Sequence, residues 1–166
     1  MTTTSLPEAT IEADPKVPII RITRDFRATP EQLMKAHLDP DLFARWVGPA
    51  SLGTTILAWD ARDGGEWRYV AARTDAPDEQ YGFRGCFHRI GDDVIVQTFT
   101  YEEMPEHVAL ETMRFTDLGD GRTRLTAESL CDSFEDRDAW LRSGMEVGID
   151  EGHLKLQALV DDGLIG

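Results

Sequence analysis

Glu111 is the polar residue of this chain whose position most clearly suggests a chemical role. In the strand-like segment 107–116 it shares the parity of Met113 and Phe115, so a β-strand would direct all three inward. Gln97 takes the corresponding inward position in the preceding segment. A buried carboxylate needs a polar partner or has a raised pKa, and both occur where a protein anchors a ligand or moves a proton. A purely structural hydrogen bond, or a bulge that turns Glu111 outward, would fit the same pattern.

The histidines and cysteines form no motif of known chemistry. None of the four histidines has a second His or Cys at the spacing of zinc ligands, and His88 shares a strand face with Cys86 but with no third partner. The chain also lacks a serine nucleophile elbow, a phosphate-binding loop and a dinucleotide-binding glycine pattern. We therefore predict no catalytic residue, no metal site and no cofactor.

Aromatic side chains alternate with charged ones in the segments 66–73 and 80–90, which predicts that the aromatic faces point inward. With the inward groups of later segments they form the predicted ligand-binding set: Trp67, Tyr69, Phe83, Phe87, Gln97, Phe99, Glu111, Met113, Met145 and Ile149. The same pattern is expected if these side chains simply fill the core. Gly85, between two aromatic residues, favours some empty volume.

The elements that must position these residues follow from local signals. A strand is predicted at 17–26, two short helices between 30 and 48, six strands within 51–130, and one long helix over about 133–160. Thr29 and Ser133 are the expected N-caps. Short connections between the strands predict an antiparallel meander. The fold class is therefore α+β: a curved, seven-stranded antiparallel sheet wrapped around a long C-terminal helix, with two short helices after the first strand.

Three glycines four residues apart, Gly144, Gly148 and Gly152, interrupt the predicted long helix. Each costs about 1 kcal/mol relative to alanine in a helix, so something must come close to the backbone there. Tight packing of helix against sheet and room for a ligand between them both satisfy this condition.

Composition limits the classes of function. The chain of 166 residues suits one domain, which we place at 17–166 behind a disordered leader at 1–16. A net charge of −14 argues against binding to nucleic acid and to anionic membrane surfaces, and no apolar run is long enough for membrane insertion. Cys86 and Cys131 are expected to be reduced, buried thiols, which favours the cytoplasm.

Several short strings carry a resemblance to a known family. They include FARW at 43–46, GGEWRY at 64–69 and GFRGCFH at 82–88, and they continue at 97–99, 104–112, 121–126 and 137–148. In this order they resemble the START/birch-pollen-allergen-like helix-grip superfamily (SRPBCC), in the branch related to the activator of the heat-shock-protein-90 ATPase. The similarity spans about residues 20–160.

The resemblance implies a helix-grip fold with an apolar cavity, which relatives use to bind lipids, hormones or polyketides and occasionally for catalysis. The leading expectation is non-catalytic binding of a small apolar or amphipathic molecule between the sheet and the C-terminal helix. One alternative is a cyclase, aromatase or hydratase that uses Glu111 or His88 as acid or base. Another is a chaperone cofactor that acts through its surface. A homodimer is compatible with this branch.

Overall fold

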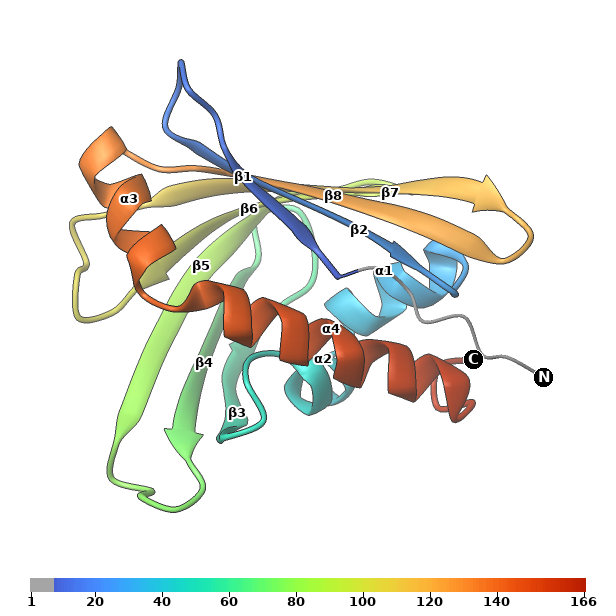
Figure 1. The fold of residues 1–166 in the computed structure, drawn as a ribbon. Coiled ribbons are helices and arrows are strands. Elements are labelled where there is room, and N and C mark those ends of the chain that lie inside the picture. Colours follow the sequence, from blue (N-terminus) through green and yellow to red (C-terminus); the bar gives the residue numbers. More distant parts are fainter. Residues whose placement is uncertain (1–7) are drawn as a thin grey trace.

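The computed structural model describes residues 8–166, which form one antiparallel sheet of eight strands and four helices (Figure 1). The strands are β1 (Thr10–Ala13), β2 (Ile19–Phe26), β3 (Leu52–Trp59), β4 (Glu66–Arg73), β5 (Gln80–Ile90), β6 (Val94–Tyr101), β7 (Ala109–Gly119) and β8 (Arg122–Leu130). The helices are α1 (Pro30–Leu38), α2 (Pro40–Trp46), α3 (Phe134–Arg142) and α4 (Met145–Asp161). The spatial order β1-β2-β8-β7-β6-β5-β4-β3 confirms the predicted meander and the α+β class.

Strand β1 is one strand more than the seven predicted, and it lies inside the segment expected to be a disordered leader. It pairs antiparallel with β2, from Thr10 opposite Thr23 to Ala13 opposite Ile20. Most of its side chains are exposed, so its stability comes from the backbone ladder, which composition does not reveal. Residues 1–7 of the predicted leader lie outside the described residues.

Local capping signals position the two short helices as predicted. The Thr29 hydroxyl accepts a hydrogen bond from the Gln32 amide at 3.2 Å, and the Gln32 side chain accepts one from the Thr29 amide at 2.9 Å. Asp39 ends α1 and caps α2 by accepting from the amides of Asp41 and Leu42. Helix α2 packs against α4.

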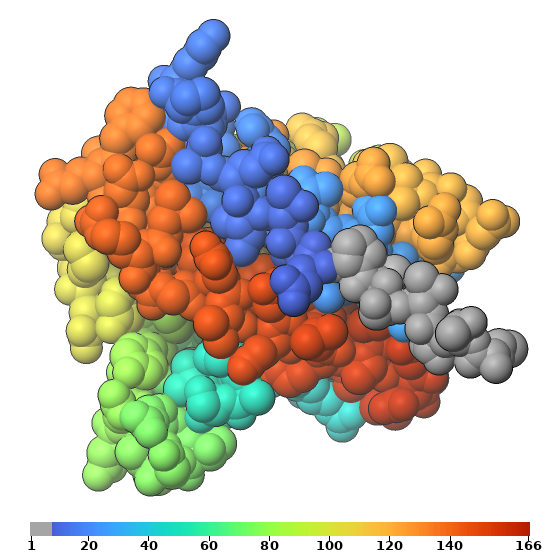
Figure 2. Space-filling view, viewed as in Figure 1, coloured from blue at the N-terminus to red at the C-terminus, as the bar shows by residue number. Residues whose placement is uncertain are grey.

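Helix α4 crosses the concave side of the sheet, and Figure 2 shows α3 and α4 as a continuous band over this side of the molecule. The core lies between α4, the two short helices and the sheet, and its fully buried side chains include Phe26, Leu33, Phe115 and Leu156. Cys131 is buried and Cys86 is exposed, both as free thiols, so the prediction of two buried thiols is wrong for Cys86. In residues 8–166 no helix is long and apolar enough to cross a membrane.

The predicted single C-terminal helix is instead two helices that meet at Gly144. This glycine has φ of +85°, in the left-handed region that favours glycine, and α4 begins directly after it. Ser133 caps α3 as predicted, with its hydroxyl accepting from the Asp136 amide at 3.0 Å. A methyl group at Gly152 would lie 3.0 Å from the Trp46 carbonyl oxygen. Close packing of α4 on the end of α2, and not on the sheet, therefore explains Gly152.

Candidate functional site

The inward aromatic layer of β4 and β5 forms as the alternation predicts. Trp67, Tyr69 and Phe87 are buried, whereas the charged positions between them are exposed. Neighbouring rings pack closely: those of Tyr69 and Phe83 lie 5.2 Å apart, and those of Trp67 and Phe99 lie 5.7 Å apart. This ring packing fits the alternative in which these side chains fill the core.

Gly85 does not mark empty volume. A methyl group there would lie 2.6 Å from Cζ2 of the Trp67 ring and would also overlap the Thr98 carbonyl oxygen. The indole of Trp67 therefore occupies the space that the glycine leaves, and that interpretation of the sequence is wrong. The glycine is required because the ring lies directly against the β5 backbone.

Gln97 and Glu111 are brought together across the β6–β7 ladder, where they are direct partners. The Gln97 side-chain amide donates a hydrogen bond of 2.9 Å to Oε1 of Glu111. Glu111 keeps partial solvent exposure, yet burial under the surrounding chain raises the pKa of its carboxyl, against the smaller opposing effect of the Gln97 bond. Burial, reinforced by the negative charge of Glu111, also raises the pKa of Tyr69. Glu111 is thus an inward carboxylate with one neutral partner.

The inner face is less completely covered beside this pair than in the core. Phe99 and Met113, on the same face as Gln97 and Glu111, remain only partly buried. Met145 and Ile149 lie in the first turns of α4 and are also partly buried. The second half of the predicted ligand-binding set therefore lies along a partly covered strip of the sheet and the start of α4.

A pocket of about 180 Å³ opens at the end of this strip, between α3 and the sheet. Its walls come from β6, from the connection between β6 and β7, from the start of β7 and from α3: Phe99, Tyr101, Met104, His107, Ala109, Asp136, Ala139, Trp140 and Ser143. The ring of Trp140 meets that of Phe99 edge to face at 5.8 Å. Of the ten residues predicted to bind a ligand, Phe99 lines this pocket and Glu111 lies two residues along β7 from Ala109 in its wall.

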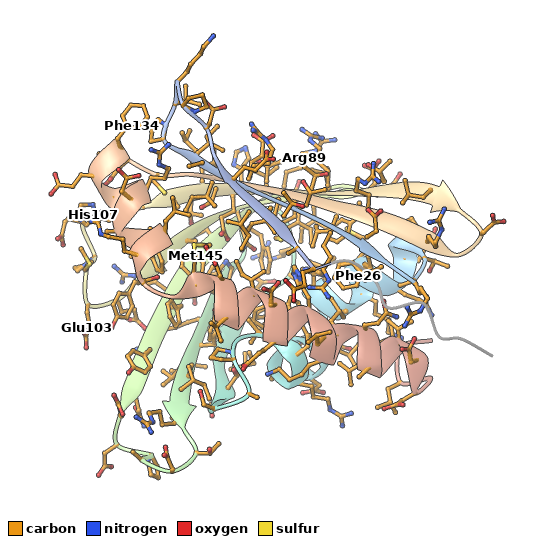
Figure 3. All side chains as sticks on the ribbon, in the orientation of Figure 1. Phe26, Arg89, Glu103, His107, Phe134 and Met145 are labelled. Carbon is orange, nitrogen blue, oxygen red and sulfur yellow. The ribbon has the colours of Figure 1, made fainter. Side chains whose placement is uncertain are left out.

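Three titratable side chains converge at the pocket. His107 precedes β7, Asp132 follows β8, and Asp136 lies in the first turn of α3; Figure 3 shows His107 beside this helix. Nδ1 of His107 lies 2.7 Å from Oδ2 of Asp132 and 3.9 Å from Oδ1 of Asp136. The three residues offer ligand atoms that all lie within 4.8 Å of one another.

The electrostatics of this cluster are set by an excess of carboxylates. The hydrogen bond to Asp132, followed by the negative charges of Asp132, Asp136 and Glu106, raises the pKa of His107 above its usual value. Burial, with a further contribution from Asp132, raises the pKa of the Asp136 carboxyl. Asp136 is nearly enclosed, with a side chain 6% exposed, whereas Asp132 is 37% exposed.

Sequence reasoning missed this cluster and most of the pocket wall for identifiable reasons. Zinc ligands are recognisable in a sequence when a second His or Cys follows a histidine at short spacing, but the partner of His107 is an aspartate 25 residues away. Trp140 lies in α3, which the sequence pattern predicted as part of one longer helix. Ser133 is the residue from which the two aspartates could have been placed. As the N-cap of a helix that directly follows a strand, it puts Asp132 just before the helix and Asp136 in its first turn.

Comparisons with known proteins agree with this architecture. The family model "Activator of Hsp90 ATPase homolog 1-like protein" matches residues 27–161, and no curated protein sequence matches the chain. A crystal structure from Mycobacterium smegmatis has a TM-score of 0.81 at 23% identity, covering 93% of this chain and 97% of that one. One from Rhodobacter sphaeroides has a TM-score of 0.78 at 22% identity, with coverages of 92% and 99%. An HSP90 activator from Plasmodium falciparum has a TM-score of 0.52 at 20% identity, with coverages of 68% and 71%.

Proposed function

The chain belongs to the activator of Hsp90 ATPase homolog 1-like family, of the SRPBCC superfamily, and from this premise we propose that it binds a small apolar or amphipathic molecule without catalysis. The site is the pocket between α3 and strands β6 and β7. The observation that carries the proposal is the aromatic pocket wall, which includes Phe99, Tyr101 and Trp140, beside an inner face that remains partly uncovered.

The size of the pocket limits the ligand. A dry apolar cavity of about 150 Å³ holds benzene, so 180 Å³ accommodates a single ring or a short alkyl chain. A longer molecule would extend along the partly covered strip over Phe99 and Met113 toward α4. Gln97 and Glu111 stand along that path, where one hydrogen-bonding pair is enough to orient a polar group against the partly covered apolar strip.

The geometry around Glu111 favours binding over acid–base chemistry. The group hydrogen-bonded to Glu111 is the amide of Gln97, which neither gains nor loses a net proton at ordinary pH and so cannot act as its acid or base partner. His88, the other candidate acid or base, is exposed on the outward-facing set of β5 and is separated from Glu111 by the sheet. Glu111 and His88 therefore do not form the acid–base pair on one side of the sheet that an enzyme of the cyclase or hydratase type would need.

A second candidate function is action as a chaperone cofactor through the surface. It is favoured by the description of the family and by the fold shared with the HSP90 activator of Plasmodium falciparum. This function does not require the pocket. The two candidates therefore differ in their response to a substitution that fills it.

Native mass spectrometry of freshly purified protein, followed by denaturing extraction, tests the binding proposal. We expect a stoichiometric small molecule that is lost on unfolding. Ala139→Trp places a large ring in the pocket and should abolish this retention, whereas Ala158→Trp, the same change at an exposed position of α4, should preserve it. A clean apo mass, with no thermal shift on adding fatty acids or single-ring aromatic compounds, would contradict the proposal and favour the surface function.

A further inference from the structure

The cluster of His107, Asp132 and Asp136 has an unusual balance of charge. Asp132 and Asp136 make no ion pair with a lysine or arginine within residues 8–166, and the imidazole of His107 is their shared counter-charge. Arg137, next in sequence to Asp136, directs its guanidinium to Asp138 and to the Asp14 carbonyl oxygen. A further carboxylate, that of Glu106, lies 3.7 Å from Nε2 of His107. The cluster therefore has a deficit of positive charge.

Asp136 is the second, independent sign of a missing partner. Its side chain is 6% exposed and belongs to the pocket wall, yet its carboxylate accepts no hydrogen bond from any group in the part of the chain that the structure describes. The nearest positive group, Nδ1 of His107, is 3.9 Å away and already bonded to Asp132 at 2.7 Å. The Asp136 oxygens are not among the fully enclosed polar atoms, so the carboxylate opens on the pocket. A nearly buried carboxylate without a donor from the protein needs water or a metal ion as its partner.

We propose that His107, Asp132 and Asp136 bind one divalent transition-metal ion at the pocket. One imidazole nitrogen and two carboxylate oxygens suit zinc, manganese or cobalt, whereas calcium and magnesium prefer oxygen ligands alone. The ion neutralises both aspartates and gives Asp136 the partner that it lacks. The protein supplies three ligands, two of which, His107 and Asp136, line the pocket, so the remaining coordination positions are open to water or to a ligand in the pocket.

The observed spacing is compatible with this assignment. Ligand atoms at about 2.1 Å from one ion lie at most about 4.2 Å apart, on opposite sides of it. The observed spread is within 4.8 Å, so rotation of the exposed Asp132 carboxylate, with loss of its hydrogen bond to His107, is enough to close the site. The ion takes the place of the proton in the hydrogen bond between His107 and Asp132. This inference is independent of the proposed function, since metal binding is measured with no organic ligand present.

Titration of chelator-treated protein with Co²⁺, followed by visible absorption, tests the proposal directly. We expect one ion per chain, with d–d bands characteristic of nitrogen and oxygen ligands, and competition by Zn²⁺ in calorimetry. His107→Ala and Asp136→Asn should weaken binding by more than the roughly 10- to 100-fold typical of residues that only orient a ligand. His88→Ala and Glu135→Gln, an exposed histidine and an exposed carboxylate at the start of α3, are the matched controls and should bind normally.

Either of two results of the Co²⁺ titration would overturn the assignment. One is substoichiometric or weak binding that His88→Ala reduces as much as His107→Ala does. The other is unchanged affinity in Asp136→Asn. If Asp136→Asn fails to fold, Asp132→Asn at the exposed position replaces it, and the ¹⁵N shifts of the His107 ring on adding Zn²⁺ to wild-type protein give a second readout. Unmoved His107 ring nitrogens at saturating Zn²⁺ would also contradict the proposal.

Discussion

Glu111 and Gln97 show how one polar pair behaves inside an aromatic layer. The two residues are direct partners in the β6–β7 ladder, so their hydrogen bond follows from the register of the two strands and requires no special loop. The carboxylate nevertheless has a raised pKa, which means that its charged form is less stable here than in water. A group with a raised pKa in the folded state destabilises the protein at pH values above that pKa, and this cost disappears as the pH falls below the unfolded value of 4.5.

Glu111→Gln should therefore stabilise the ligand-free protein at pH 7. The glutamine keeps an oxygen that accepts from Gln97 and removes the buried charge, for a gain on the order of 1 kcal/mol. Urea unfolding at pH 7 and at pH 4 is the measurement, and the gain should shrink at the lower pH. Glu66→Gln, which removes an exposed carboxylate from the outward face of β4, is the control and should leave stability unchanged. A loss of stability at pH 7 would mean that the charge of Glu111 has a partner after all.

At the scale of elements, the two glycines of α4 face different neighbours. A methyl group at Gly152 would lie 3.0 Å from the Trp46 carbonyl oxygen and 3.3 Å from the Gly48 nitrogen, both backbone atoms held by α2 and the connection after it. At Gly148 the nearest atom is the ring Cδ of Pro49, at 3.3 Å, with more open space around it.

We predict that Gly152→Ala destabilises the protein by about 1 to 3 kcal/mol, the range for overpacking, despite the gain in helix propensity. Gly148→Ala should cost clearly less, because one proline ring shifts more easily than two backbone groups. Thermal unfolding of the two variants side by side checks the order. Equal stabilities, or a less stable Gly148→Ala, would show that α4 does not lie as close to α2 as the structure indicates.

The elements also show what a sequence can and cannot predict. Thr29 and Ser133 were identifiable as caps because capping depends on residues three positions apart, and the strand alternation of β4 and β5 predicted the buried face correctly. The break at Gly144 was missed because a glycine in a helical pattern does not reveal its φ angle. Strand β1 was missed because its pairing with β2 is a backbone interaction with a weak side-chain pattern.

The same distinction applies to the candidate site. The inward positions of Gln97 and Glu111 follow from period-two alternation within single strands. The pocket and the cluster of His107, Asp132 and Asp136 join the start of β7, the end of β8 and the first turn of α3. No spacing within one element carries this information, because curvature of the sheet decides which strand end meets α3.

At the scale of the whole molecule, two histidines lie inside the core of a strongly acidic protein. Burial lowers the pKa of His37 to about 4, although Nδ1 donates to the Leu33 carbonyl oxygen at 2.7 Å. Burial, followed by the positive charges of Arg24 and His37, lowers the pKa of His153 to about 3. Both rings pack against aromatic side chains, His37 against Trp46 and His153 against Phe26.

These histidines should make the protein sensitive to mild acid. In the unfolded chain they bind protons near pH 6.5, whereas in the folded protein they remain neutral down to about pH 4, so unfolding takes up protons in this window. The two histidines therefore do not lower the free energy of unfolding above pH 6.5, and they lower it progressively as the pH drops below that value. His37 alone accounts for a loss on the order of 3 kcal/mol between pH 6.5 and 4.

Urea unfolding at half-unit steps from pH 7.5 to about pH 4 measures this dependence, since the free energy of unfolding changes with the difference in bound protons. His37→Gln removes the titrating ring and keeps an amide donor for the Leu33 carbonyl oxygen, so its curve should be flatter than that of the wild type, whatever its stability at pH 7. His88→Gln, at an exposed position, should keep the wild-type slope. If His37→Gln and wild type lose stability in parallel, His37 must be protonated inside the folded protein. The carboxylates, and not the buried histidines, would then set the acid limit.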